Sequence, residues 1–396
     1  MSGIPIHAVL SPELILEILD ALAVPLQFHE RSCDLSVLAA CTTVCKAWSA
    51  HAQRLLFRRV ILPNNFYREP HARGATRDSL PSFLAAIDPE TERGRWLAES
   101  VVSFTLRHTG RGLTADSASL ATALLRLPNL RHLDVTTIFC NFDPETVARL
   151  RESGPRLVSL AISKDFVPAM GQHTRIMHQL VALFPSLRLL EITSNLNETL
   201  VPFDPPPNLS LVCAKFNVAL VEDIAPCLAS LLNPQADAPL QVLWHKSRGG
   251  HPSVLDDVLR THGLHLRSLA LKTLDPEDAS PAIAQCAVLE RFEYGRFPDA
   301  AILALIPRSI TALAICGVHT ENGNGHFERY VDGLVQALPT FPHLKALTWS
   351  ACPQPVMFPA LEWMCSERGI ELRISAAELT DDNAVELDLR QKYIRI

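Results

Sequence analysis

The residues of this chain whose types could support chemistry include a histidine pair and two pairs of aspartates. His262 and His265 lie close together around Gly263, as two metal ligands could. A metal site needs further ligands at a defined spacing, however, and the sequence supplies none here. Asp256–Asp257 and Asp381–Asp382 are adjacent, so on a regular element their side chains point to different faces. We interpret these groups as helix-end loops and solvated caps, and we expect no metal site.

A glycine-rich turn, Asn322-Gly323-Asn324-Gly325, could in principle cradle a phosphate. That role needs a strand before the turn and a helix with a lysine after it, whereas His326-Phe327 follows. The sequence also lacks a P-loop, a G-x-S-x-G elbow, an H-E-x-x-H pair and a dinucleotide fingerprint. We therefore predict no catalytic residue and no cofactor. A hidden hydrolase or transferase would need a deep pocket with a convergent nucleophile and base.

Composition limits the remaining classes of function. The 10 cysteines are scattered without a C-x-x-C pair, which favours reduced thiols in the cytoplasm or nucleus. Hydrophobic residues make up 48% of the chain, enough for a substantial core. The net charge of -6 argues against general affinity for nucleic acid. No apolar run reaches the roughly 20 residues of a membrane span, so we expect no membrane partner.

The segment from Leu10 to Leu22 has the pattern of a helix. Ser11 can cap it, Pro12 suits its first position, and Glu13 suits the positive end of its dipole. Apolar residues recur at helical spacing and form a stripe: Leu14, Ile15, Ile18, Leu19 and Leu22.

Two further helices are expected before residue 60. Asp34 can cap the second, and the third runs from about Val44. The third helix would place five residues on one side: Val44, Cys45, Trp48, Ala52 and Leu55. Three short helices form only a marginal core by themselves, so they either cap the following domain or bind a partner.

The order of residues from about Leu10 to Leu62 resembles the F-box motif, especially versions found in mushroom-forming fungi. The match rests on the run Leu10 to Leu14, on Val44-Cys45-Lys46-Ala47-Trp48, and on Arg54 to Val60. The resemblance implies contact with the Skp-family adaptor of cullin-RING ubiquitin ligases. It carries over this contact or support set: Leu10, Pro12, Glu13, Leu14, Ile18, Val44, Trp48 and Leu55. Trp48 could be a core residue or an interface anchor, and Ser11 departs from the adjacent Leu-Pro of many members.

A leucine-containing phrase recurs after a polar, proline-punctuated stretch at residues 63–96. The copy at Pro128 to Val135 is followed by similar copies at Pro155 to Ile162, Pro185 to Ile192 and Pro342 to Trp349, with weaker copies between them. Amphipathic segments separate the copies, and Asp143-Pro144-Glu145 has the residues of a helix start in one of them. The phrase resembles a leucine-rich repeat, though its spacing varies and its asparagine is often replaced. A chance set of Leu-rich units in an ordinary α/β fold is the alternative.

We therefore predict an α/β fold class: a three-helix F-box at 1–62, a linker at 63–96, and an irregular leucine-rich-repeat-like solenoid at 97–396 in which short parallel strands alternate with helices. Side chains between the strand leucines would face an open surface. The candidates for binding a target are His132, Asp134, Glu191, Lys272, Arg291 and Glu293.

Two functions from different classes follow. In the first, the chain is the substrate-recognition subunit of a Skp–cullin–F-box ligase: the F-box binds the adaptor and the repeats hold an unknown target protein. It would act by raising effective concentration, not by bond chemistry. In the second, the chain is a non-catalytic interaction scaffold that recruits no ligase.

Overall fold

The computed structural model describes residues 12–23, 35–62, 79–106, 117–137, 141–164, 176–194, 209–217, 228–229, 231–232, 238–245, 252–271, 281–295, 298–316, 325–350, 358–374 and 384–394. The chain divides into two compact units. The first comprises residues 1–159, 172–179 and 396, and the second comprises residues 160–171 and 180–395.

The three predicted N-terminal helices are confirmed. They are α1 (Pro12–Ala23), α2 (Leu35–Cys41) and α3 (Lys46–Arg58). Pro12 stands at the first helical position of α1, where its fixed φ is favourable and its missing N–H costs no hydrogen bond. The predicted caps Ser11 and Asp34 lie outside the described residues. Hydroxyl groups of Thr42 and Thr43 donate to backbone carbonyls at the end of α2, at 2.6 and 2.8 Å, where the chain turns toward α3.

The rest of the first unit alternates short strands with helices. Its elements are β1 (Arg59–Leu62), α4 (Ser79–Ala86), α5 (Glu92–Ser100), β2 (Ser103–Leu106), α6 (Ser117–Arg126), β3 (His132–Thr137) and α7 (Pro144–Ser153). Asp143 caps α7 by accepting from the Thr146 N–H at 2.8 Å, as its Asp-Pro-Glu sequence predicts. Strand β1 follows α3 without a loop, and both contact neighbours within this unit.

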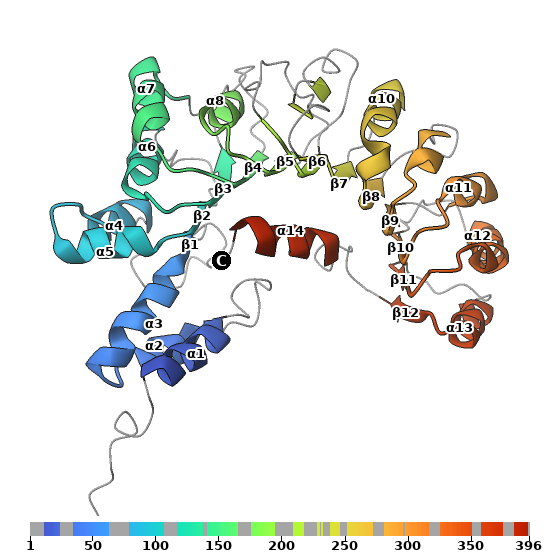
Figure 1. Cartoon of the computed structure of the whole chain (residues 1–396), viewed down its shortest axis with the longest axis horizontal. Helices are drawn as coiled ribbons and strands as arrows, with labels where there is room; N and C mark the ends of the chain where they lie inside the picture. Colours follow the sequence, from blue (N-terminus) through green and yellow to red (C-terminus); the bar gives the residue numbers. More distant parts are fainter. Residues whose placement is uncertain are drawn as a thin grey trace, which may run out of the picture. The chain divides into compact units, whose positions relative to one another are not determined.

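The remaining elements are β4 (Ser159–Lys164), α8 (Ile176–Leu183), β5 (Leu189–Ser194), β6 (Cys213–Asn217), β7 (Val242–His245), α10 (Pro252–His262), η5 (Gly263–His265), β8 (Ser268–Leu271), η7 (Pro281–Gln285), β9 (Arg291–Tyr294), α11 (Ala300–Leu305), β10 (Ala312–Ile315), α12 (Gly325–Ala337), η8 (Leu338–Thr340), β11 (Ala346–Trp349), α13 (Phe358–Glu367), β12 (Glu371–Ile374) and α14 (Ala384–Ile394). In the second unit, α10 to α13 lie on one side of the strands and α14 lies on the other (Figure 1).

The strands are joined by a regular ladder that starts one residue before each strand. In the second unit the Arg267 N–H donates to the Gln241 carbonyl at 2.8 Å, and the Glu290 N–H donates to the Arg267 carbonyl at 2.8 Å. The same step continues from Thr311 to Glu290 at 2.7 Å and from Lys345 to Thr311 at 2.8 Å. Pairing therefore depends on the register of the strand starts, not on the number of residues between them.

The predicted fold class is wrong. The sequence predicts a three-helix F-box followed by an irregular leucine-rich-repeat-like solenoid, whereas the structure has a 12-stranded parallel sheet in the order β1 to β12, with helices between strands. Its first strand, Arg59–Leu62, pairs with β2 and lies in the segment assigned to the helical module. The unequal spacing of the recurrent phrases suggested an irregular array. The differences in spacing arise from connecting segments of different length, which lie outside the ladder of paired strands. The boundaries near residues 62 and 96 stay predictions.

Alternation along each strand defines two faces of the sheet. Leu243, Leu269 and Phe292 are register partners on β7, β8 and β9, and each is almost completely buried. They share a face because side chains two residues apart point the same way. The next position along the same strands carries Trp244, Ala270 and Glu293 on the opposite face. Lys215 is the register partner of Trp244, so it also belongs to this second face.

Candidate functional site

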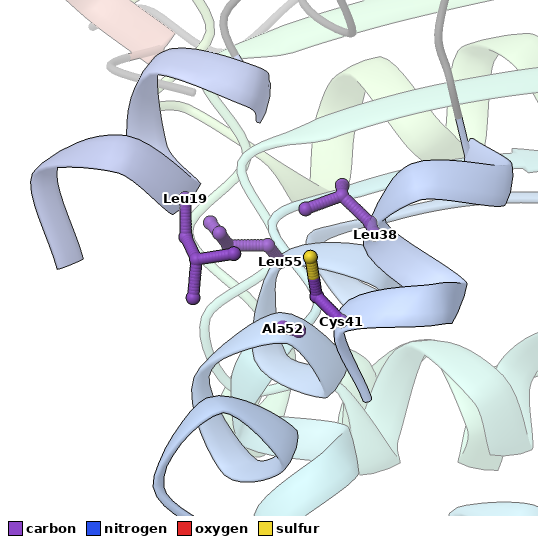
Figure 2. Close-up of a cluster of buried hydrophobic side chains, with 5 residues drawn as sticks. All are labelled: Leu19, Leu38, Cys41, Ala52 and Leu55. Carbon is purple, nitrogen blue, oxygen red and sulfur yellow. The ribbon is translucent and has the colours of Figure 1, made fainter. Parts of the chain in front are cut away.

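The three N-terminal helices share a small core. Leu19 of α1, Leu38 and Cys41 of α2, and Ala52 and Leu55 of α3 point toward one another (Figure 2) and are at most 7% exposed. Two of these five side chains, Cys41 and Ala52, are small, so the apolar area removed from water is modest. The core is extended at its edge by Val37, Trp48 and Leu56.

Among its described side chains, helix α1 has three exposed large apolar residues: Leu14, Leu16 and Ile18. Leu14 is 42% exposed and Ile18 is 37% exposed, and their spacing of one helical turn places them on the same face. Leu16 is 40% exposed on a different face, and Val44, in the turn between α2 and α3, is 57% exposed. Single exposed leucines are ordinary, but a helix with this concentration is typical of an interaction surface. We call Leu14 and Ile18 the α1 apolar face.

The predicted adaptor-binding residues other than Trp48 divide into three groups. Glu13, Leu14, Ile18 and Val44 are exposed. Leu55 is 5% exposed and belongs to the core, so it supports the helices from within. Leu10 and the side chain of Pro12 lie outside what the structure describes.

Trp48 belongs to the edge of the small core. Its side chain is half-buried and packs against the buried cluster, so it contributes to the core, and its role as an interface anchor stays a prediction. Its indole Nε1 is buried and has no hydrogen-bond partner among the described residues. A buried indole N–H without an acceptor is unfavourable.

Two predicted target-binding residues lie on β3 in the first unit. His132 Nδ1 is 2.8 Å from the Ser159 hydroxyl, and the donor is set by the histidine tautomer. Asp134 is half-buried and is the register partner of Thr105 on β2. Both side chains have partners within the chain, so their availability to a target is limited.

Of three further candidates, two lie in the second unit and one lies outside the described residues. Arg291 and Glu293 of β9 are paired with each other at 3.9 Å between Nη2 and Oε2. Glu293 was expected on an open surface, but the residue is 5% exposed. Lys272 lies outside the described residues. The row predicted as an open stripe is therefore partly enclosed.

The remaining candidate, Glu191 of β5, belongs to a charge cluster beneath α14. Lys215 Nζ of β6 lies 2.6 Å from Glu386 Oε1 and 3.8 Å from Glu191 Oε2. Arg390 Nε donates to Glu386 Oε1 at 2.8 Å, and Arg390 Nη2 lies 3.9 Å from Glu191 Oε2. We call Glu191, Lys215, Glu386 and Arg390 the α14 charge cluster. It contains two acids and two bases, so its charges balance.

The pKa values of the cluster reflect a competition between burial and pairing. Burial opposes ionisation of Glu386, but Lys215 and Arg390 outweigh burial and hold the pKa of that carboxyl below its usual range. Burial likewise disfavours the charged form of Lys215, but Glu386 and Glu191 raise its pKa above the usual value. Lys215 and Glu386 are therefore both charged at neutral pH, because each offsets the cost of burying the other.

Two contacts surround the cluster. Lys215 Nζ lies 4.0 Å from the ring centroid of Trp244 on β7, a cation–π geometry. At the rim, Arg267 donates to both carboxylate oxygens of Glu290 at 2.6 and 3.1 Å and lies 3.9 Å from Asp388 of α14. The thiol of Cys213, two residues before Lys215 on β6, is buried, and burial raises its pKa.

The sequence patterns did not point to Lys215, Glu386 or Arg390 as site residues. The spacing of Glu386 and Arg390 is that of a helical acid–base pair and could have been found in the sequence. Nothing in the sequence indicated that this pair meets Lys215, which belongs to a strand far earlier in the chain. The site is created by tertiary structure.

Neither a metal-binding cluster nor a membrane-spanning helix occurs in the parts of the chain that the structure describes. Those parts contain no group of three or more His, Cys, Asp or Glu residues placed to hold a metal ion. Within the same residues, no helix combines the length and apolar character needed to cross a bilayer.

Comparisons with known proteins add little. No protein-family model matches the chain, and no curated protein matches it. A search of solved structures returned, among others, the HpcH/HpaI aldolase from Desulfitobacterium hafniense DCB-2, at 11% identity, covering 66% of this chain and 89% of that one. Its TM-score of 0.16 is too low to carry any argument about fold or activity.

Proposed function

We propose that this chain is a substrate-recognition subunit of a Skp–cullin–F-box ubiquitin ligase. In this proposal α1 to α3 bind a Skp-family adaptor, and the parallel sheet holds a target protein near the ligase. The chain performs no bond chemistry and acts by tethering, in the cytoplasm or nucleus, where such ligases work.

The observation that supports this function is the exposed α1 apolar face. Leu14 and Ile18 are substantially exposed one turn apart, while Leu19 on the same helix is fully buried in the core. A partner that covered both side chains would remove apolar area worth roughly 1.5–3 kcal/mol for each residue if fully buried. Glu13 and Val44 would lie within the same interface, and Leu55 and Trp48 would hold the helices in place.

Capture of a fungal Skp-family adaptor by the full-length chain tests this function. We expect Leu14→Glu and Ile18→Glu each to weaken adaptor binding at least tenfold, because each places a charge in an apolar interface. The matched control is Leu16→Glu, which changes a residue of similar exposure (40%) on another face and should leave binding unchanged.

The unfolding midpoints of the three variants should equal that of the native chain, because all three positions are on the surface. Failure of the native chain to bind the adaptor would favour the scaffold function. Equal loss of binding in Leu16→Glu would show that α1 does not present one specific face.

A further inference from the structure

Helix α14 covers a row of side chains that differs in kind from the buried core. Glu191, Lys215 and Trp244 are successive register partners on β5, β6 and β7, so they form one row on one face of the sheet. The row presents an acid, a cation and an aromatic ring side by side. Figure 1 shows α14 on this side of the strands, away from α10.

The helix matches the row by charge and spacing. Glu386 reaches Lys215 at 2.6 Å, and Arg390, one turn later, lies 3.9 Å from Glu191. Val385 and Leu389 are 5% and 1% exposed and supply the apolar part of the contact surface. The row is therefore complementary to a helix with an acid and a base one turn apart beside buried apolar residues.

This kind of contact favours specificity over permanent stability. Desolvation of buried charges offsets much of their attraction, so an ionic cluster often stabilises a protein no more than apolar residues of similar size. A mismatched charge in the same place is strongly unfavourable, which selects one helix sequence and one register. The rim contact of Asp388 with Arg267 adds little, because Asp388 is 67% exposed.

We infer that the row Glu191–Lys215–Trp244 is a binding surface for a helix that bears a glutamate and, one turn later, an arginine beside apolar residues. Helix α14 is the intramolecular occupant of this surface. A partner helix with the same pair displaces α14 and takes its contacts. This inference deepens the proposed function by naming the class of target, and it rests on that function only for the partner being a ubiquitination target.

The test uses the full-length chain and a fluorescently labelled peptide with the native sequence of residues 381–396. In the native chain α14 occupies the surface, so the peptide should bind weakly. The variant Glu386→Lys/Arg390→Glu opposes like charges across the contact and should release α14. We expect that variant to bind the native peptide at least tenfold more tightly than the native chain does.

A charge reversal on both sides separates specific pairing from general damage. Adding Lys215→Glu and Glu191→Lys to the helix variant restores opposite charges, so α14 should close again and peptide binding should return to the native level. Hydrogen exchange of residues 384–394 should be fast in the helix variant and slow in the native and fully reversed chains. Asp388→Asn is the matched control and should change neither measurement.

Several results would overturn the inference. Peptide binding that is equal in the native chain and the helix variant would do so, as would protection of residues 384–394 that survives the charge swap. If the helix variant fails to fold, the fully reversed chain still tests the inference, because that chain must fold and protect α14 from exchange.

Adaptor capture is measured on the same variants, since the α1 apolar face is unchanged in them. Loss of adaptor capture by all chains contradicts the proposed function but does not contradict the helix-binding surface.

Discussion

Replacement of Lys215 by methionine tests the physical account of the α14 charge cluster. Methionine has a similar length and keeps apolar contact with Trp244, but it removes the ammonium group 2.6 Å from Glu386. Glu386 remains buried at 7% side-chain exposure and keeps Arg390 at 2.8 Å as a cationic partner. The change therefore leaves an acid-rich cluster in a place poorly reached by water.

The expected magnitude follows from the burial of both partners. Removing one member of a buried ion pair costs about 3–5 kcal/mol, because the remaining charge stays desolvated. Arg390 partly compensates Glu386, which favours the lower end, about 3 kcal/mol. Loss of the cation–π contact with Trp244 at 4.0 Å acts in the same direction. At about 1.4 kcal/mol for each factor of ten, α14 should open roughly 100-fold more often.

Hydrogen exchange of the full-length protein measures this opening directly. Peptides covering residues 384–394 should lose about 100-fold in protection in Lys215→Met, while peptides covering β9 and β10 should change little. The double variant Lys215→Met/Glu386→Met replaces the pair by apolar side chains of similar volume and should recover most of the protection.

Two results would contradict this reasoning. Protection of α14 that falls by less than about threefold in Lys215→Met would show that the buried pair does not hold the helix. A double variant as unprotected as the single one would show that lost packing, and not an uncompensated carboxylate, causes the effect.

Two further predictions concern pH and the N-terminal core. The pKa of Glu386 is lowered from 4.5 in the folded chain, so its contribution to α14 attachment is present above that value and is lost as pH falls below it. Hydrogen exchange of residues 384–394, corrected for intrinsic rates, should accelerate in that acidic range. Acceleration that begins above pH 6 would contradict the assignment. Leu38→Ala removes a side chain that is 1% exposed and should lower the free energy of unfolding of α1 to α3 by about 2–5 kcal/mol in urea melts. The surface change Leu16→Ala should alter it by less than about 0.5 kcal/mol, and equal effects of the two would place Leu38 outside the core.

The local elements of this chain follow from the sequence because they depend on neighbouring residues. Pro12 and the stripe containing Leu19 predict α1, and the Asp-Pro-Glu run predicts α7 with Asp143 as its cap. The recurrent phrases also mark strands: the phrase from Pro185 covers most of β5, and the phrase from Pro342 contains β11. In each case helix or strand periodicity and capping act over only a few residues.

The global arrangement did not follow, because it depends on pairing between distant segments. Unequal intervals between phrases suggested an irregular array after a separate helical module, but hydrogen bonding between strand starts produces a 12-stranded parallel sheet that begins at Arg59. A sequence pattern fixes which residues can pair; it does not fix how far the ladder extends.

The candidate site shows the same division more sharply. The sequence identified Glu191 as a residue of an exposed stripe and left Glu386 and Arg390 as an unremarked helical pair. Only the tertiary structure brings α14 onto β5 and β6, where Lys215 is held 2.6 Å from Glu386. Desolvation and Coulomb attraction act through space and depend on burial. The charges that define this surface are therefore buried and paired only when the chain is folded.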